Sequence, residues 1–145
     1  MTSITPITKT KGSHMLLTIA SVTCLATNIY FEARSEDRVG QYAVAEVTLN
    51  RVASPDYPDD VCKVVWQDKQ FSWTHDGKSD KPTDAEAWSQ ALSIAANAIG
   101  DYELEDMRIF RQTVLYYHAK SVTPYWSKSM RQVGVIGSHI FYEAG

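Results

Sequence analysis

The spacing of apolar residues predicts a helix over about residues 16–35. Val22, Leu25 and Ile29 lie three and four residues apart, which places them on one face of a helix. A second helix is predicted over 39–52, where apolar residues occur on more than one side. That distribution is typical of a helix enclosed by the rest of its domain.

The second half of the chain changes from helical to strand-like patterning. Thr83 and Glu86 have the spacing of a capping box, and the apolar positions behind them repeat at helical intervals as far as Gly100, the expected stop. Two β-branched and aromatic segments, 113–117 and 136–142, predict short strands. Helices followed by a small antiparallel sheet predict a predominantly helical α+β domain.

Glu32 continues the apolar stripe of the first helix, three residues beyond Ile29. Burial would raise the pKa of its carboxyl, and Glu36, one helical turn further on, would raise it again through its negative charge. A carboxyl that stays protonated near neutral pH can donate a proton to the leaving oxygen of a glycosidic bond. On spacing alone, a Glu32 that ends the helix and points to water is the more common arrangement.

A second candidate site is a run of four residues that alternates aromatic and polar side chains. It consists of Gln70, Phe71, Ser72 and Trp73. Aromatic faces can stack on sugar rings while amides and hydroxyls bond their substituents, although ordinary core packing explains the same pattern. His118 and His139 could act as bases, but an isolated histidine is more often packed or hydrogen-bonded.

The composition fits one globular domain. The chain has 145 residues, of which 44% are hydrophobic, and a net charge of −3. This charge argues against nucleic acid as a partner, and no apolar run is long enough to cross a membrane. Residues 1–14 end in a sequence that resembles the remnant of an expression tag, so we expect a tag or disordered extension there and the domain over 15–145.

Two cysteines, Cys24 and Cys62, leave their pairing open. On their number alone, unpaired core thiols are the more common arrangement. No further ligands stand at zinc spacing, so we expect no metal site, and no phosphate-binding loop or other cofactor motif is present.

Several segments together resemble the SleB-type cell-wall hydrolase family, a lysozyme-like group that includes spore cortex-lytic enzymes. The matching segments are residues 28–34, 40–41, 43–45, 49–52, 57–58, 61–62, 70–73, 118–119, 124, 126, 136–137 and 139–142. Residues 28–34 read Asn-Ile-Tyr-Phe-Glu-Ala-Arg, and the family's catalytic glutamate matches Glu32. The resemblance covers nearly all of the chain after Met15.

The resemblance implies a lysozyme-like fold that acts on peptidoglycan, with Glu32 as the general acid. It also implies lytic transglycosylase chemistry, which ends the product in 1,6-anhydromuramic acid. A hydrolytic muramidase using Glu36 or a bound water, and a non-catalytic wall-binding module, are the alternatives. Residues expected to bind the glycan are Tyr30, Glu36, Gln70, Phe71, Ser72, Trp73, His118 and Trp126.

The family resemblance also bears on the cysteines and on location. The cysteine pair recurs in such proteins, which makes a Cys24–Cys62 disulfide and two free thiols equal alternatives. We expect a monomer that works on peptidoglycan strands as a secreted, periplasmic or wall-associated protein, or as a lysin released by a phage. No export signal is visible in the sequence.

Overall fold

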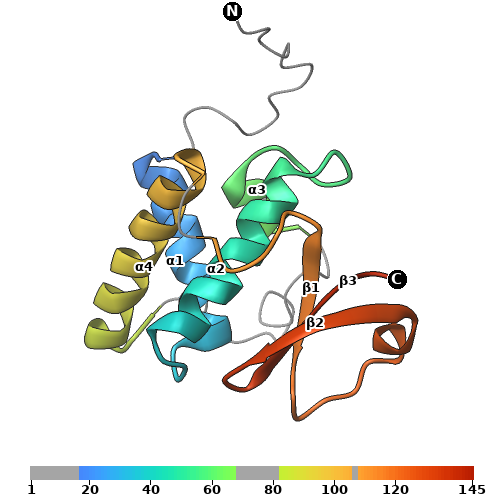
Figure 1. Ribbon diagram of the computed structural model, residues 1–145. Coiled ribbons are helices and arrows are strands. Elements are labelled where there is room, and N and C mark those ends of the chain that lie inside the picture. The colour runs from blue at the N-terminus through green and yellow to red at the C-terminus, as the bar shows by residue number, and fades with distance from the viewer. Residues whose placement is uncertain (1–16, 68–81, 106–107) are drawn as a thin grey trace, which may run out of the picture.

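The structure is a computed structural model that describes residues 17–67, 82–105 and 108–145. Within these ranges helices precede a three-stranded sheet, and Figure 1 shows the helices on one side of the molecule and the sheet on the other. The elements are α1 (Ile19–Ala33), α2 (Arg38–Ala53), α3 (Val61–Val65), α4 (Ala85–Glu103), β1 (Val114–Ala119), the 3-10 helix η2 (Tyr125–Ser129), β2 (Met130–Ile136) and β3 (His139–Ala144). The predicted α+β fold is confirmed.

Each long helix begins at a side chain that accepts a hydrogen bond from the backbone of its first turn. Thr18, Asp37 and Asp84 hold these positions in α1, α2 and α4, with oxygen–nitrogen distances of 3.0, 2.9 and 3.0 Å. Such caps contribute about 1 kcal/mol each. The capping box predicted at Thr83 is wrong by one residue, because the Asp84 carboxylate accepts these bonds instead.

Helix α4 continues beyond Gly100, where the sequence predicted its end. Tyr102 is only 8% exposed, so the additional turn adds apolar contacts to the core. The chain then leaves the helix through Glu105, which has a φ of 56°. A left-handed residue at this place ends the helix although no glycine is present.

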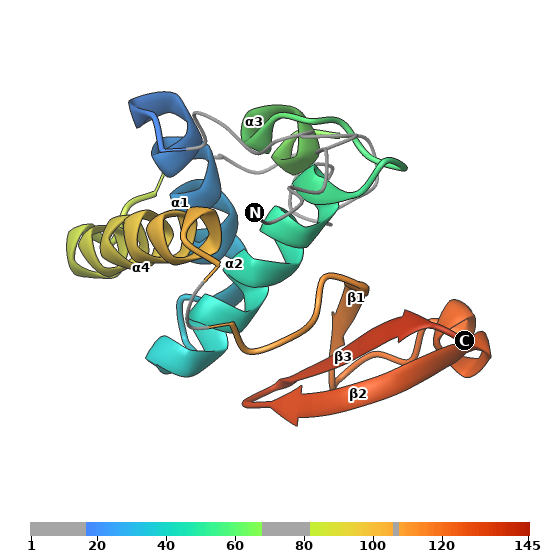
Figure 2. The same ribbon diagram turned by 45° about the horizontal axis from the view of Figure 1, so that its top comes forward.

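Helix α2 lies at the centre of the domain, as the distribution of its apolar residues predicted. Every residue from 43 to 52 is buried. Leu49 packs with Ile99 in the cluster between the helices, whereas Val44 packs with Phe141 of the sheet. Figure 2 shows α2 between the α1–α4 pair and the strands. Burying one such side chain contributes about 1.5–3 kcal/mol, so both faces of α2 stabilise the fold.

The sheet has the order β1-β3-β2, and both pairs are antiparallel. The strands predicted at 113–117 and 136–142 correspond to β1 and β3. Strand β2 was not predicted. It is an edge strand with a register shift between Gln132 and Gly134, so its side chains do not show a regular alternation of apolar and polar residues.

The short helix α3 is joined to α1 by a disulfide between Cys24 and Cys62. This settles the pairing that the sequence left open. The cross-link closes a loop of 38 residues, and closing such a loop removes conformational freedom from the unfolded chain. It therefore fixes α3, which was not predicted from the sequence, against the start of the domain.

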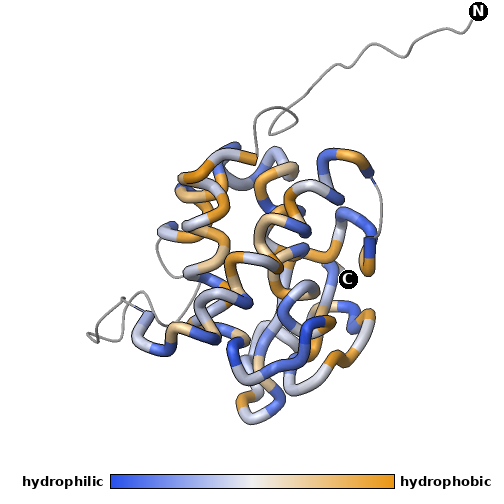
Figure 3. Tube along the Cα trace, turned by 90° about the vertical axis from the view of Figure 1, so that its left-hand side faces the viewer, coloured by the Kyte–Doolittle hydropathy of each residue, from blue (hydrophilic) through white to orange (hydrophobic). Residues whose placement is uncertain are grey.

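Polar and apolar residues are mixed along the helices, as Figure 3 shows by colour. No helix in the described ranges combines the length and the apolar character needed to cross a membrane. The apolar residues of the helices serve instead to pack against one another and against the sheet.

Candidate active site

Glu32 lies in the last turn of α1, partly buried, on the face that the apolar stripe predicted. Burial raises the pKa of its carboxyl from 4.5 to about 7, against the smaller opposing effects of hydrogen bonding by Tyr117 and of the positive charge on Arg51. Near neutral pH the protonated and ionised forms are therefore both populated. A carboxyl in this state can donate a proton and then accept one.

Tyr117 brings β1 to the acid. Its ring stacks on Phe141, with centroids 5.7 Å apart, and meets the edge of His139 at 5.3 Å. Burial, followed by the negative charge of Glu32, raises the pKa of the Tyr117 phenol well above its ordinary value. The phenol therefore keeps its proton and can act as a hydrogen-bond donor toward the Glu32 carboxyl.

Asn28 and Thr48 extend this polar group into the core between α1 and α2. Both side chains are fully buried, and the Thr48 hydroxyl donates to Asn28 Oδ1 over 3.1 Å. Hydrogen bonding by Asn28 also opposes the rise in the pKa of Tyr117. Since Asn28 Oδ1 accepts the hydrogen bond from Thr48, the amide nitrogen of Asn28 faces away from Thr48. A hydrogen bond thus joins Thr48 to Asn28, and both Asn28 and Glu32 act on the pKa of Tyr117.

Glu36 does not lie where the sequence predicted. Helix α1 ends at Ala33, so Glu36 is not one helical turn above Glu32. Its carboxylate instead accepts hydrogen bonds from the backbone nitrogen of Ser138, at 2.9 Å, and from the Ser138 hydroxyl. Although burial raises the pKa of Glu36, these bonds bring it below its ordinary value.

Glu36 therefore anchors the turn between β2 and β3 to the junction of α1 and α2. Glu36 is not among the groups that shift the pKa of Glu32, so the prediction that its negative charge raises that pKa is wrong. Both of its carboxylate oxygens accept hydrogen bonds from Ser138, and its contact with a glycan stays a prediction.

Tyr30 is a buried anchor instead of the predicted glycan contact. It is 1% exposed, and its hydroxyl accepts hydrogen bonds from the backbone nitrogens of Thr83 and Asp84 at 3.1 and 2.9 Å. Arg34 lies over the ring, 4.5 Å from its centroid. Tyr30 therefore holds the start of α4 against α1 and presents almost no surface to a ligand.

His118 and Trp126 lie on the other face of the sheet from Tyr117, because successive strand residues point to opposite faces. Both His118 ring nitrogens are engaged, at 2.7 Å to the Ala119 carbonyl and 2.7 Å to the Tyr142 hydroxyl. Trp126 packs edge-on against His118, with centroids 5.7 Å apart. The structure thus does not bring these two predicted contacts to Glu32.

His139 is 6% exposed beside Tyr117, and burial lowers its pKa more than the charge of Glu36 raises it. It is therefore largely neutral near pH 7. The predicted sugar-binding residues Gln70, Phe71, Ser72 and Trp73 lie outside the described residues.

The part of the chain that the structure describes contains no group of three or more His, Cys, Asp or Glu side chains placed to hold a metal ion. Asn28 could have been found from the sequence, because it precedes Glu32 by one helical turn. Tyr117 could not, because it is distant in the chain and only the fold brings it there.

Comparison with known proteins gives consistent results. The model of the cell wall hydrolase family matches residues 35–142, beginning just after Glu32. Spore cortex-lytic enzymes of Halalkalibacterium halodurans and Bacillus subtilis are 33% and 31% identical in sequence to this chain. The two alignments cover 81% and 82% of it. The chain spans about a third of those relatives, 33% and 36% of their lengths.

Two solved structures share the fold. The catalytic domain of the Bacillus cereus SleB protein has a TM-score of 0.68 and 29% identity, covering 84% of this chain and 88% of that one. The catalytic domain of the germination-specific lytic transglycosylase SleB from Bacillus anthracis has a TM-score of 0.60 and 26% identity, covering 96% and 100%. The chain belongs to the cell wall hydrolase family, and its fold is that of the SleB catalytic domains.

Proposed function

We propose that this domain cleaves peptidoglycan strands between N-acetylmuramic acid and N-acetylglucosamine, with Glu32 as the general acid. The observation that carries the proposal is the half-buried Glu32 carboxyl, whose pKa is raised to about 7 beside the Tyr117 phenol. The names of the similar proteins, spore cortex-lytic enzyme and lytic transglycosylase, support the same substrate class. Peptidoglycan lies outside the cytoplasmic membrane, where the Cys24–Cys62 disulfide is also expected to form.

The chemistry we propose is lytic transglycosylation. The Glu32 carboxyl gives its proton to the glycosidic oxygen as the bond to the muramic acid anomeric carbon breaks. The 6-hydroxyl of the same sugar then bonds to that carbon, and its proton passes to the Glu32 carboxylate. The acid is regenerated and no water is consumed, so a single carboxyl with a pKa near neutrality suffices.

Tyr117 and Arg51 moderate this acid. Their hydrogen bond and positive charge both favour the ionised carboxyl and oppose the effect of burial. They therefore stabilise Glu32 in the state it reaches after it has given up its proton.

Product analysis tests this chemistry. Digestion of purified peptidoglycan should give fragments that end in 1,6-anhydromuramic acid, as measured by mass spectrometry, and Glu36→Gln should give the same products. We expect Glu36→Gln to lower stability by about 1 kcal/mol through its weaker bonds to Ser138. Reducing ends without the anhydro ring, together with an inactive Glu36→Gln protein, would favour a muramidase.

The pH dependence of the rate tests the role of Glu32. Because Glu32 must be protonated to act as the acid, kcat/KM should fall as the pH rises through about 7, by up to tenfold for each pH unit above that value. The measurement is a series of initial rates on a soluble glycan fragment between pH 5 and pH 9. A rate that stays constant up to pH 9 would exclude Glu32 as the acid.

A further inference from the structure

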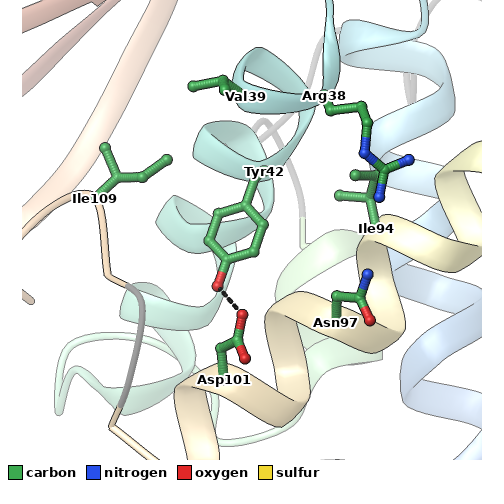
Figure 4. Close-up of a pocket in the computed structure, with 7 residues that line it drawn as sticks. All are labelled: Arg38, Val39, Tyr42, Ile94, Asn97, Asp101 and Ile109. Atoms are coloured by element: carbon green, nitrogen blue, oxygen red, sulfur yellow. Dashed lines mark hydrogen bonds between the residues drawn. The ribbon is translucent and has the colours of Figure 1, made fainter.

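A pocket of about 360 Å³ opens between α2 and α4. Arg38 and Tyr42 line it from α2, and Asn97 and Asp101 line it from α4, as Figure 4 shows. The volume falls in the range of sites that bind small molecules in proteins. None of these residues takes part in the arrangement around Glu32.

The pocket lies on the side of α2 away from the acid. A helix turns roughly 100° per residue, so Arg51 is on the opposite side of α2 from Tyr42. The charge of Arg51 acts on Glu32, which places the acid on the Arg51 side. A ligand in the pocket would therefore be separated from the proposed site of cleavage by the body of α2.

Charges of both signs line the pocket. The Arg38 guanidinium extends from the first turn of α2 toward α4, and the Asp101 carboxylate lies on α4. One oxygen of Asp101 accepts a hydrogen bond from the Tyr42 hydroxyl at 2.7 Å, and the carboxylate has further lone pairs for a cation. Asn97 adds an amide that can both donate and accept.

The rest of the lining is apolar. Val39 is 56% exposed and Ile109 is 39% exposed, and Ile94 completes this part of the wall. A ligand that satisfies all of these groups carries a carboxylate for Arg38, an ammonium group for Asp101, peptide amides for Asn97 and small methyl groups for the apolar side chains. A short zwitterionic peptide has this chemistry.

We propose that the pocket between α2 and α4 binds the peptide stem of peptidoglycan. This inference rests on the proposed function, which supplies the wall as substrate. Such stems combine free carboxylates, a free amine and alanine methyl groups within a few residues. Because α2 separates the pocket from Glu32, the bound stem would belong to a strand next to the one being cut, and the pocket would hold the enzyme on the wall.

Binding of a soluble stem tetrapeptide tests the proposal directly. We would titrate it, free of glycan, into the Glu32→Gln protein and follow the backbone amides by NMR. Saturable shifts at the pocket are expected, with affinity weakened about threefold or more by Arg38→Gln and by Asp101→Asn. Asp101→Asn keeps an acceptor for Tyr42, so the fold should be preserved.

Lys63→Gln and Glu86→Gln are matched controls, because they remove the same charges from exposed positions in α3 and α4. They should leave the affinity for the tetrapeptide unchanged. No saturable shift at the pocket, or equal weakening by the control variants, would overturn the proposal.

The two proposals fail separately. Arg38→Gln should slow lysis of intact peptidoglycan about threefold and leave the rate on glycan strands stripped of their peptides unchanged. An equal loss on both substrates would overturn the peptide site. In that case, anhydro products from the stripped strands would still support the proposed function. Conversely, if the tetrapeptide binds but no anhydro products form, only the proposed cleavage is contradicted.

Discussion

Glu32→Gln is expected to abolish lysis of peptidoglycan while the fold is retained. The amide has nearly the same shape as the carboxyl but cannot give a proton to the leaving oxygen. General-acid catalysis contributes about 100-fold to 10,000-fold in rate, so a loss of at least about 100-fold is expected. Dye release from labelled peptidoglycan measures the loss, and circular dichroism checks the fold. Near-normal activity in a folded variant would contradict the assignment.

The same variant should be more stable than the parent protein at alkaline pH. The pKa of Glu32 is about 7 in the folded state and 4.5 ordinarily. As the pH rises between those values, the unfolded chain loses this proton more readily than the folded one, so the free energy of unfolding falls. At about 1.4 kcal/mol per pH unit, the ionised carboxyl costs the folded state up to about 3 kcal/mol. The amide does not ionise and avoids this cost.

Denaturant unfolding at pH 5 and pH 8 measures this difference. The stability gained by Glu32→Gln should be larger at pH 8. A protein that loses activity because it unfolds would show the opposite, so the pair of measurements separates a catalytic role from a structural one. Equal gains at both pH values would contradict the raised pKa.

Gly137→Ala is expected to lower the free energy of unfolding by about 2–4 kcal/mol. Gly137 has a φ of 58°, which costs a residue with a Cβ about 1–2 kcal/mol. The new methyl group would also overlap the Glu36 carboxylate and push it off Ser138, which removes charge-assisted hydrogen bonds. Because β3 carries His139 and Phe141 against Tyr117, we also expect reduced activity.

Gly134→Ala is the matched control for this variant. Gly134 lies in β2, three residues before Gly137, and a Cβ added there meets no atom within 4 Å. Its stability should stay within about 0.5 kcal/mol of the parent. Thermal unfolding of both variants makes the comparison, and equal losses would mean that the β2–β3 turn is not anchored by Glu36.

The predictions from the sequence succeeded where the signal was periodic and local. Leu25 and Ile29 are fully buried, and Glu32 lies on the face that their spacing defined. The enclosure of α2 followed from apolar residues on several of its sides. Helical period carries this information because each side chain's direction depends on its own place in the turn.

The predictions failed where a distant contact decides the role of a residue. Glu36 was expected on the α1 face, but Ser138, 102 residues away, holds its carboxylate. Tyr30 shares a helix turn with Glu32 but is buried by its bonds to the start of α4. His118 and Tyr117 are neighbours in β1, and only the packing of the sheet shows which one faces the acid. No local pattern encodes such choices.

The order of the strands determines when the acid can acquire its surroundings during synthesis. Strand β3 is the last of the three in sequence but lies between the other two, and β1 and β2 form no pairs with each other. Until β3 has been made, Tyr117 has neither Phe141 nor His139 beside it. Since non-local pairing closes late in folding, Tyr117 would gain these two neighbours only after residues 139–144 have been translated, although β1 itself is made much earlier.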